Sequence, residues 1–297
     1  MQHQRTVRRL RDLLEPIAAS VYFAPECHAA YQDLGFGPSE GDFGGVAAPN
    51  RVAYFWSRGA AIGDVDGEVI ASAFGVFNPS IVCPQVDQAR AIASRAAILD
   101  ARMSGQRAFL DRVLGPDARA NVAAALAILR DLADATTLPG HPLCAGLRAL
   151  GSPGDELGDL WRAADIVREH RGDAHVVAWT GAGLSGPQIM LLTEHWWAIP
   201  RRSYAATRGW TADQFDEAQD QLEAGGLVRG DDLTTEGMSL RRAIEDATDW
   251  QERGVADALG SRGNELFALL APIVSDIVTH AGYPPAAFMT ESDLDRR

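Results

Sequence analysis

The sequence contains no lysine, so each of its 27 basic residues is an arginine. This absence excludes mechanisms that require a lysine amine, such as a Schiff base to pyridoxal phosphate. Asp and Glu number 40, which gives a formal net charge of −13. Proteins that grip duplex DNA gain most of their affinity by replacing counterions with basic side chains. The composition therefore opposes DNA binding unless a local basic patch overrides it. The one basic cluster is also consistent with a solvated helix face and consists of Arg5, Arg8, Arg9 and Arg11.

Cysteine and long apolar runs are also scarce. Cys27, Cys83 and Cys144 are far apart and form no CxxC pair, so neither a disulfide framework nor a thiolate zinc site is indicated. No apolar run approaches the roughly 20 residues that span a bilayer. The N-terminal arginines precede no apolar stretch of the kind found in a secretory signal. We therefore expect a cytoplasmic protein that does not contact a membrane.

Helical patterns dominate what is present. Residues 5–35 predict two helices broken at "FAPE", and residues 86–135 are rich in Ala and Arg with apolar stripes typical of helices. Between them, residues 37–67 are rich in Gly, Pro and Asp, so turns are expected there. A second stretch dense in Pro and Gly follows the long helices. We place a boundary in it, between an N-terminal helical lobe over 1–150 and a C-terminal lobe over 151–297.

The stretch "VREHRGDAHVVA", residues 167–178, places six polar side chains in an otherwise apolar helix that is expected to end at "TGAGLSGP". Continuing the apolar stripe puts His170 and Arg171 on the buried face, and buried ionisable groups must be paired. The stretch therefore predicts a polar network inside the C-terminal lobe. The network either fixes helix packing or lines a pocket, with His170 or His175 as an acid, a base or a ligand anchor.

The acidic residues of this stretch and its histidines allow two further inferences. Glu169 and Asp173 share a side of the helix, and two neighbouring acids can raise a carboxylate pKa. His170 and His175 lie about 140° apart around a helix, which is poor geometry for a shared metal ion. His195 in "TEHWW" would have to supply a third ligand, so no metal site is predicted.

A second cluster occurs in "YFAPECHAAY", residues 22–31. Glu26 lies in the first turn of a predicted helix, where the helix dipole alone explains an acid. Alternatively, this cluster forms the other wall of a pocket between the lobes, with Glu26 as a third catalytic candidate. Aromatic residues around Trp56 and Trp196 suit a planar apolar ligand or a hydrophobic core equally well. The candidate ligand-binding residues are Tyr22, Glu26, His28, Trp56, Glu169, His170, Arg171, Asp173, His175, His195 and Trp196.

Residues 209–245 have the sequence pattern of a DNA-binding element but lack the net positive charge of such an element. In "TADQFDEAQDQLEAGGLV", apolar residues recur at helical spacing and a Gly-Gly pair ends the run, before "RGDD" and a second helix. Donors to base edges are limited to Gln214, Gln219 and Gln221. The helix has no Lys or Arg, and its five acids are Asp213, Asp216, Glu217, Asp220 and Glu223. Because acids repel phosphates, we expect the element to keep its shape and to have lost DNA reading.

These residues carry two resemblances. Residues 187–249 resemble the winged-helix domain of MarR-type bacterial regulators, through "PQIMLLTEHWW", "TADQFDEAQDQLEAGGLV" and "LTTEGMSLRRAIEDATD". The whole chain resembles a family of actinobacterial helix-turn-helix-like proteins, through "EPIAASVYFAPE", "GEVIASAFGVFNPSIV" and "LWRAADIVREHRGDAHVVA". The first resemblance implies a winged helix and a homodimer formed by the terminal helices. The second resemblance implies a fold but does not indicate an activity.

Together these features predict a mainly α protein with a two-lobed, winged-helix-like architecture and short β-wings, in which the N-terminal lobe is a degenerate winged helix or a plain helical unit. We expect it to hold a small aromatic or apolar molecule and to have lost DNA binding. Two alternatives stay open. One is an enzyme of specialised metabolism with a His- and Glu-lined cleft between the lobes. The other is a MarR-like transcription regulator that acts through its arginine-rich N-terminal helix. The sequence indicates no particular cofactor, and the expected partners are a small molecule and a second copy of the chain.

Overall fold

The computed structural model describes residues 2–284. Residues 285–297, the end of the predicted C-terminal lobe, lie outside the described part, as does Met1. Helices make up most of the structure, which confirms the mainly α class. The α-helices are α1 (Gln2–Ala19), α2 (Pro25–Asp33), α3 (Arg51–Gly59), α4 (Gly67–Phe74), α5 (Pro79–Ile92), α6 (Arg95–Val113), α7 (Pro116–Asp134), α8 (Pro142–Ala149), α9 (Glu156–Gly181), α10 (Gly186–Trp197), α11 (Ala212–Ala224), α12 (Thr235–Gln251), α13 (Arg253–Leu259) and α14 (Gly263–Thr279).

Short elements connect these helices. Two antiparallel strand pairs occur among the described residues, and each pair is a hairpin with a two-residue turn. None of the described helices combines the length and the apolarity needed to cross a membrane. The strands are β1 (Asp42–Phe43), β2 (Val46–Ala47), β3 (Val228–Arg229) and β4 (Asp232–Leu233), and the 3-10 helices are η1 (Ser20–Tyr22), η2 (Ala205–Arg208) and η3 (Gly260–Arg262).

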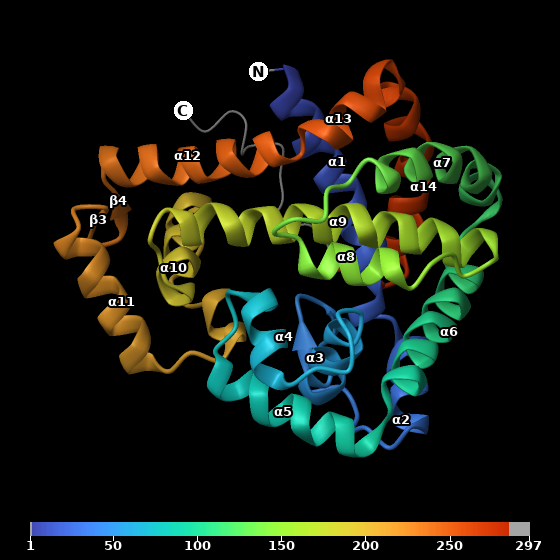
Figure 1. Cartoon of the computed structure of the whole chain (residues 1–297), viewed down its shortest axis with the longest axis horizontal. Coiled ribbons are helices and arrows are strands. Elements are labelled where there is room, and N and C mark those ends of the chain that lie inside the picture. Colours follow the sequence, from blue (N-terminus) through green and yellow to red (C-terminus); the bar gives the residue numbers. More distant parts are fainter. Residues whose placement is uncertain (1, 285–297) are drawn as a thin grey trace.

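The long helix α9 runs through the middle of the molecule (Figure 1). Asp155 caps its first turn by accepting a hydrogen bond from the backbone N–H of Gly158 at 2.9 Å. Helices α1, α7, α8 and α12 pack along it. The main core extends from Leu10 on α1 to Ile277 on α14, both almost fully buried. Helices from both sides of residue 150 therefore share one core, and the division into two lobes stays a prediction.

The terminal helices pack against each other inside this core. α1 contacts α9, α12 and α14, while α14 also contacts α7. The apolar stripe of α14 is fully buried and consists of Leu266, Leu270, Ile273 and Ile277. The apolar faces that the MarR resemblance assigns to a dimer interface are thus used within the chain, and the homodimer stays a prediction.

The segment around residues 51–59 differs from the expectation of turns, because it forms α3. Asn50 caps this helix by accepting a hydrogen bond from the N–H of Ala53 at 3.1 Å. Phe55 and Trp56 on the helix are fully buried, and the indole of Trp56 donates to the carbonyl of Ala93 at 3.0 Å. Burial of this aromatic face outweighs the weak local signal of a short segment flanked by glycines.

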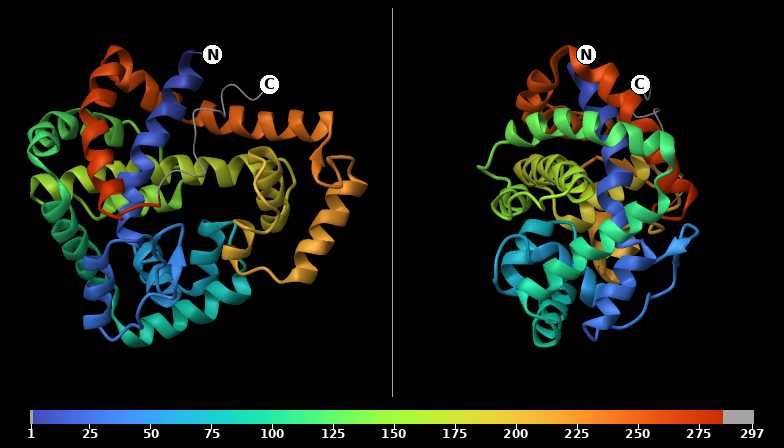
Figure 2. Two further views of the ribbon diagram at one scale, coloured as in Figure 1. Left: turned by 180° about the vertical axis from the view of Figure 1, so that it is seen from behind. Right: turned by 90° about the vertical axis from the view of Figure 1, so that its right-hand side faces the viewer.

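One end of the molecule is formed by α10, η2, α11, the β3–β4 hairpin and α12. The order helix, hairpin, helix is the one that the sequence predicts. Thr211 and Gln214 close the first turn of α11 with a reciprocal capping box. Gly230 begins the hairpin turn with a φ of 60°, which favours glycine. In Figure 1 and in the left view of Figure 2, α11 and this hairpin lie at the outer edge of the molecule.

Candidate ligand-binding site

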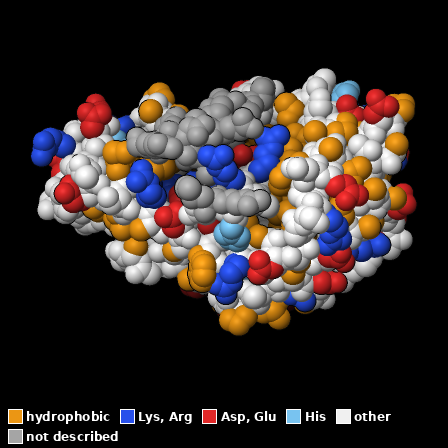
Figure 3. All heavy atoms as spheres, turned by 90° about the horizontal axis from the view of Figure 1, so that it is seen from above, with side chains coloured by type: hydrophobic (Ala, Val, Ile, Leu, Met, Phe, Trp, Pro, Cys, Tyr) orange, Lys and Arg blue, Asp and Glu red, His pale blue; other side chains and the backbone are white. Residues whose placement is uncertain are grey.

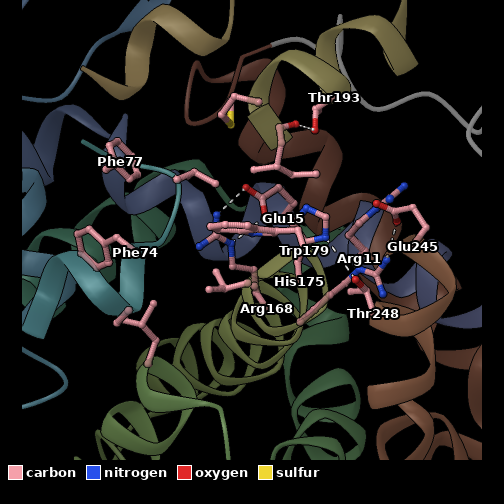
Figure 4. A pocket seen from close by; sticks show the side chains of 18 of the residues that line it. Arg11, Glu15, Phe74, Phe77, Arg168, His175, Trp179, Thr193, Glu245 and Thr248 are labelled. Atoms are coloured by element: carbon pink, nitrogen blue, oxygen red, sulfur yellow. Dashed lines mark hydrogen bonds and ion pairs between the residues drawn. The ribbon is translucent and has the colours of Figure 1, made fainter. Parts of the chain in front are cut away.

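A cavity of about 260 Å³ lies beside the C-terminal half of α9, and we call it the α9 cavity. Its walls come from α1, α3, α4, α8, α9, α10 and α12, and from Tyr204 and Arg208 at the two ends of η2. Figure 4 shows Phe74 and Phe77 on one side of the pocket, and Arg11 and Glu245 on the opposite side. The lining is therefore aromatic at one end and charged at the other.

A second cavity of about 430 Å³ adjoins the first, and we call it the outer cavity. The residues that line the outer cavity but not the α9 cavity include Tyr22, Phe43 and Tyr283. Both cavities are lined by Glu15, Tyr54, Phe77, Arg168, Trp197, Tyr204 and Arg208. Because they share these seven residues, the two cavities lie next to each other, and we call them together the recess.

A buried ion network lies beside the cavities, and its Glu15 and Arg168 line both of them. The guanidinium of Arg58 binds both carboxylate oxygens of Glu169 at 2.8 Å, and Arg168 donates to the same carboxylate at 2.8 Å. Arg168 also binds Glu15 at 2.8 and 3.1 Å. Burial alone would raise the pKa of Glu169, but the charges of Arg58 and Arg168 outweigh it and lower this pKa to about 2. Glu169 is therefore a structural anion.

A second ion network joins α1, α9 and α12. Arg171 contacts Asp249 at 2.9 Å and Glu245 at 3.3 Å, and Arg8 donates to Asp249 at 2.8 Å. The prediction that His170 and Arg171 face inward and belong to a polar network is confirmed, since they are 1 % and 9 % exposed. Arg8, a member of the basic N-terminal cluster, is buried in this network.

His170 is fully engaged by its own chain. Its Nε2 accepts the backbone N–H of Thr137 at 3.2 Å, so in the neutral ring Nδ1 carries the proton. Nδ1 lies 2.5 Å from Oε1 of Glu252, and the ring stacks on His141 with centroids 4.0 Å apart. His170 does not line the α9 cavity, whereas Glu252 does.

His175 lines the α9 cavity, next to Trp179 (Figure 4). Its Nδ1 lies 3.3 Å from the hydroxyl of Thr248. The pKa of His175 is lowered to about 4, mainly by desolvation on burial; Glu245 opposes this shift, and the nearby Arg241 and Arg171 add to it. At neutral pH His175 is therefore an uncharged hydrogen-bonding group.

Of the cluster predicted over residues 22–31, Glu26 and His28 lie outside the lining of the recess. Glu26 forms an ion pair with Arg112, and a ring nitrogen of His28 lies 2.8 Å from the carbonyl oxygen of Tyr22. Tyr22 itself lines the outer cavity, and its hydroxyl accepts a hydrogen bond from Arg102 at 3.2 Å. Of this cluster, Tyr22 alone is in the lining of the recess.

The remaining candidates lie apart from the α9 cavity. Asp173 accepts the N–H of Cys144 at 3.0 Å in the first turn of α8, and burial raises the pKa of Asp173 to about 8. Desolvation is the main cause of this rise, and the neighbouring Glu169, which the sequence suggested as a cause, adds a smaller part. A ring nitrogen of His195 lies 2.8 Å from the carbonyl oxygen of Asp231, and Trp196 is buried beneath Arg241. Trp56 belongs to the core.

The sequence did not single out most of the residues that line the recess. The missed residues include seven from four separate segments of the chain, namely Arg58, Phe74, Phe77, Arg168, Trp179, Tyr204 and Arg208. The aromatic density around Tyr54 was a usable signal for one wall. "RRSYAATRGW" combines aromatic and basic residues and was a second signal.

"GPSEG" has the spacing of the hydrolase motif GxSxG, and "GAGLSG" has that of the dinucleotide-binding motif GxGxxG. Neither has the structural surroundings that its motif requires. "GPSEG" holds Ser39, whose hydroxyl donates to the carbonyl oxygens of Gly41 and Ala48 at 3.1 and 2.6 Å. "GAGLSG" follows a helix, whereas a dinucleotide-binding loop follows a strand. Across residues 2–284, no three His, Cys, Asp or Glu side chains are grouped so that they could hold a metal ion.

The outward face of α11 is acidic, since its five acids are all exposed. Gln214 accepts hydrogen bonds from Asn78 and from the backbone of Thr211 at 3.1 and 3.0 Å. Gln219 donates to Glu223 and to the backbone of Gly230, while Gln221 bonds Glu217 and Gln188. On the face seen from above, basic side chains lie beside acidic ones (Figure 3).

The comparisons with known proteins agree with the helix-turn-helix resemblance. No curated protein and no solved structure matches the chain. The likeness to MarR-type regulators and an actinobacterial source therefore stay predictions. The model of a helix-turn-helix family matches residues 7–284 and so covers nearly the whole sequence. The chain belongs to this helix-turn-helix family.

Proposed function

We propose that the protein binds a small, largely apolar molecule in the α9 cavity. The observation that carries this proposal is the recess itself, in which aromatic side chains surround a volume that the chain leaves unfilled. The recess opens to the solvent, so it is a cleft that a small molecule can enter. Ligand sites are typically lined by apolar side chains together with polar groups that orient the ligand, and here His175, Thr193 and the arginines of the lining supply such groups.

The charged residues beside the recess support binding rather than acid–base catalysis. Glu169 is held as an anion by two arginines, and both ring nitrogens of His170 are occupied. His175 has a pKa of about 4 and would be a weak base at neutral pH. The side chains that reach the recess are therefore suited to orienting a molecule.

A cavity-filling substitution tests this function. Gly172 on α9 lines the cavity, and a Cβ built there meets only Oε2 of Glu169, at 3.4 Å. Gly172→Leu should fill the cavity without straining the backbone, and loss of a helical glycine favours the fold by up to about 1 kcal/mol. Screened by thermal shift, aromatic compounds that raise the melting temperature of the wild type should not stabilise this variant.

Gly181→Leu is the matched control, because Gly181 ends the same helix and a Cβ there meets nothing within 4 Å. This control should respond to the same compounds as the wild type. Equal stabilisation of Gly172→Leu and the wild type would contradict binding in the α9 cavity. A screen in which nothing stabilises the wild type would also count against the proposal.

Transcription regulation is the second candidate function, and membership of the helix-turn-helix family favours it. Against it stand the exposed acids of α11, the engaged glutamines and the burial of Arg8. We infer that the end of the molecule formed by α10 to α12 keeps a winged-helix-like arrangement and has lost DNA reading. Ligand binding is therefore the better-supported function.

A further inference from the structure

Six arginines line the α9 cavity, and five of them have a carboxylate partner. Arg208 differs, because no Asp or Glu oxygen within residues 2–284 approaches its guanidinium to 4.0 Å. The five ion pairs are Arg11 with Asp12, Arg58 with Glu169, Arg168 with Glu15, Arg171 with Asp249 and Arg241 with Glu245. Arg208 thus brings a positive charge to the recess that the described part of the chain does not balance.

The position of Arg208 is fixed by neutral groups. It ends η2 and lies between two rings, with its guanidinium carbon 4.7 Å from the centroid of Phe77 and 4.5 Å from that of Tyr204. Nη2 donates to the hydroxyl of Tyr204 at 2.5 Å, and Nη1 donates to the hydroxyl of Thr207 at 2.9 Å. Its Nε is buried and has no hydrogen-bond partner among the described residues.

This arrangement leaves a partly desolvated cation without a counterion. Removing a charge from water costs free energy that an ion pair or strong hydrogen bonds must offset. Glu15 lines both cavities as well, but Arg168 binds both of its oxygens. The aromatic rings stabilise the guanidinium only modestly. An anion in the recess would supply the missing partner and would form a charge-assisted hydrogen bond.

We propose that the ligand carries a single anionic group that pairs with Arg208, while its apolar body lies against Phe77 and the other rings of the recess. This inference rests on the proposed function and adds the chemical class of the ligand. Arg208 lines both cavities, so the anionic group would lie at their junction. From there the apolar body can extend toward Phe74 and Trp179 or toward Tyr22.

The test compares two probes of nearly equal shape, 2-naphthoate and 2-naphthamide, by isothermal titration calorimetry. The wild type should bind the anionic probe more tightly by about tenfold, the usual effect of one charge-assisted contact. Arg208→Met should remove this preference and still bind 2-naphthamide, which also verifies that the cavity is intact. Arg242→Met, at an exposed arginine of α12 outside the recess, is the control and should keep the preference.

The outcomes separate the two proposals. Equal affinity of the wild type for both probes, or an unchanged preference in Arg208→Met, would overturn the role of Arg208 and leave the α9 cavity as a binding site. Failure of the wild type to bind either probe at millimolar concentration would count against both proposals. If Arg208→Met does not fold, Arg208→Gln replaces it, since Gln keeps donors and loses the charge, and the same loss of preference is expected.

Discussion

His175 was predicted as a site residue and lines the α9 cavity. Its lowered pKa should make the stability of the fold depend on pH. Its pKa is lowered from 6.5 to about 4, so between these values the unfolded chain binds a proton that the folded chain does not. Stability should therefore fall as the pH drops from about 6.5 to 4, with no contribution from this group above that range. The charged groups facing the ring are Glu245 and Arg241 on α12, Arg171 on α9 and Arg11 on α1.

Urea unfolding of the wild type and of His175→Gln at several pH values tests this expectation. The free energy of unfolding of the variant should depend less steeply on pH between about 6.5 and 4. His280→Gln, at an exposed histidine just after α14, is the control and should follow the wild type. Parallel curves for the wild type and His175→Gln would show that the cavity does not depress the pKa of His175.

At the scale of the element, α11 carries a prediction about DNA. Each exposed acid beside a phosphate opposes docking by on the order of 1 kcal/mol at moderate screening, and α11 exposes five. In a selection from random-sequence duplexes at physiological salt, the wild type should enrich no sequence. Enrichment of a defined site, with affinity falling steeply as salt rises, would contradict the loss of DNA reading.

The double variant Arg5→Ala, Arg9→Ala distinguishes the element responsible if binding does occur. These are the two members of the N-terminal basic cluster that are exposed. Binding that disappears in this variant would belong to α1, as the regulator alternative requires. Binding that persists would belong to the end of the molecule formed by α10 to α12.

The elements that the sequence predicts well are those with a strong local signal. α9 and α10 occur where expected, because the helical pattern is long and Pro187 suits a first turn. α3 was missed because its nine residues lie between turn-rich segments, and only the burial of Phe55 and Trp56 reveals why it is helical. Short elements depend on tertiary packing more than on propensity.

The candidate site was predictable only in part, for the same reason. The periodicity of α9 identified Arg171 and His175, since both the buried face and the polar residues are local features. The partners of these residues come from α12, more than 70 positions away. Periodicity also could not distinguish His170, which is engaged inside the fold, from His175, which lines the cavity.

At the scale of the whole molecule, the absence of lysine and the buried ion networks belong together. The planar guanidinium of arginine can donate two parallel hydrogen bonds to one carboxylate, so arginine suits buried ion pairs better than lysine does. Arg58 and Arg168 use this geometry on Glu169 and Glu15. The networks hold α1, α3, α9 and α12 around the recess, which allows the fold to keep a central cavity open.

The most direct test of this account is native mass spectrometry of the protein as isolated from its own host. We predict a mass excess of one small molecule per chain, which is released on denaturation, is absent from Gly172→Leu and is present in Gly181→Leu. A native mass equal to that of the bare chain, together with no binding of either naphthalene probe, would contradict the claim that the α9 cavity is a ligand site.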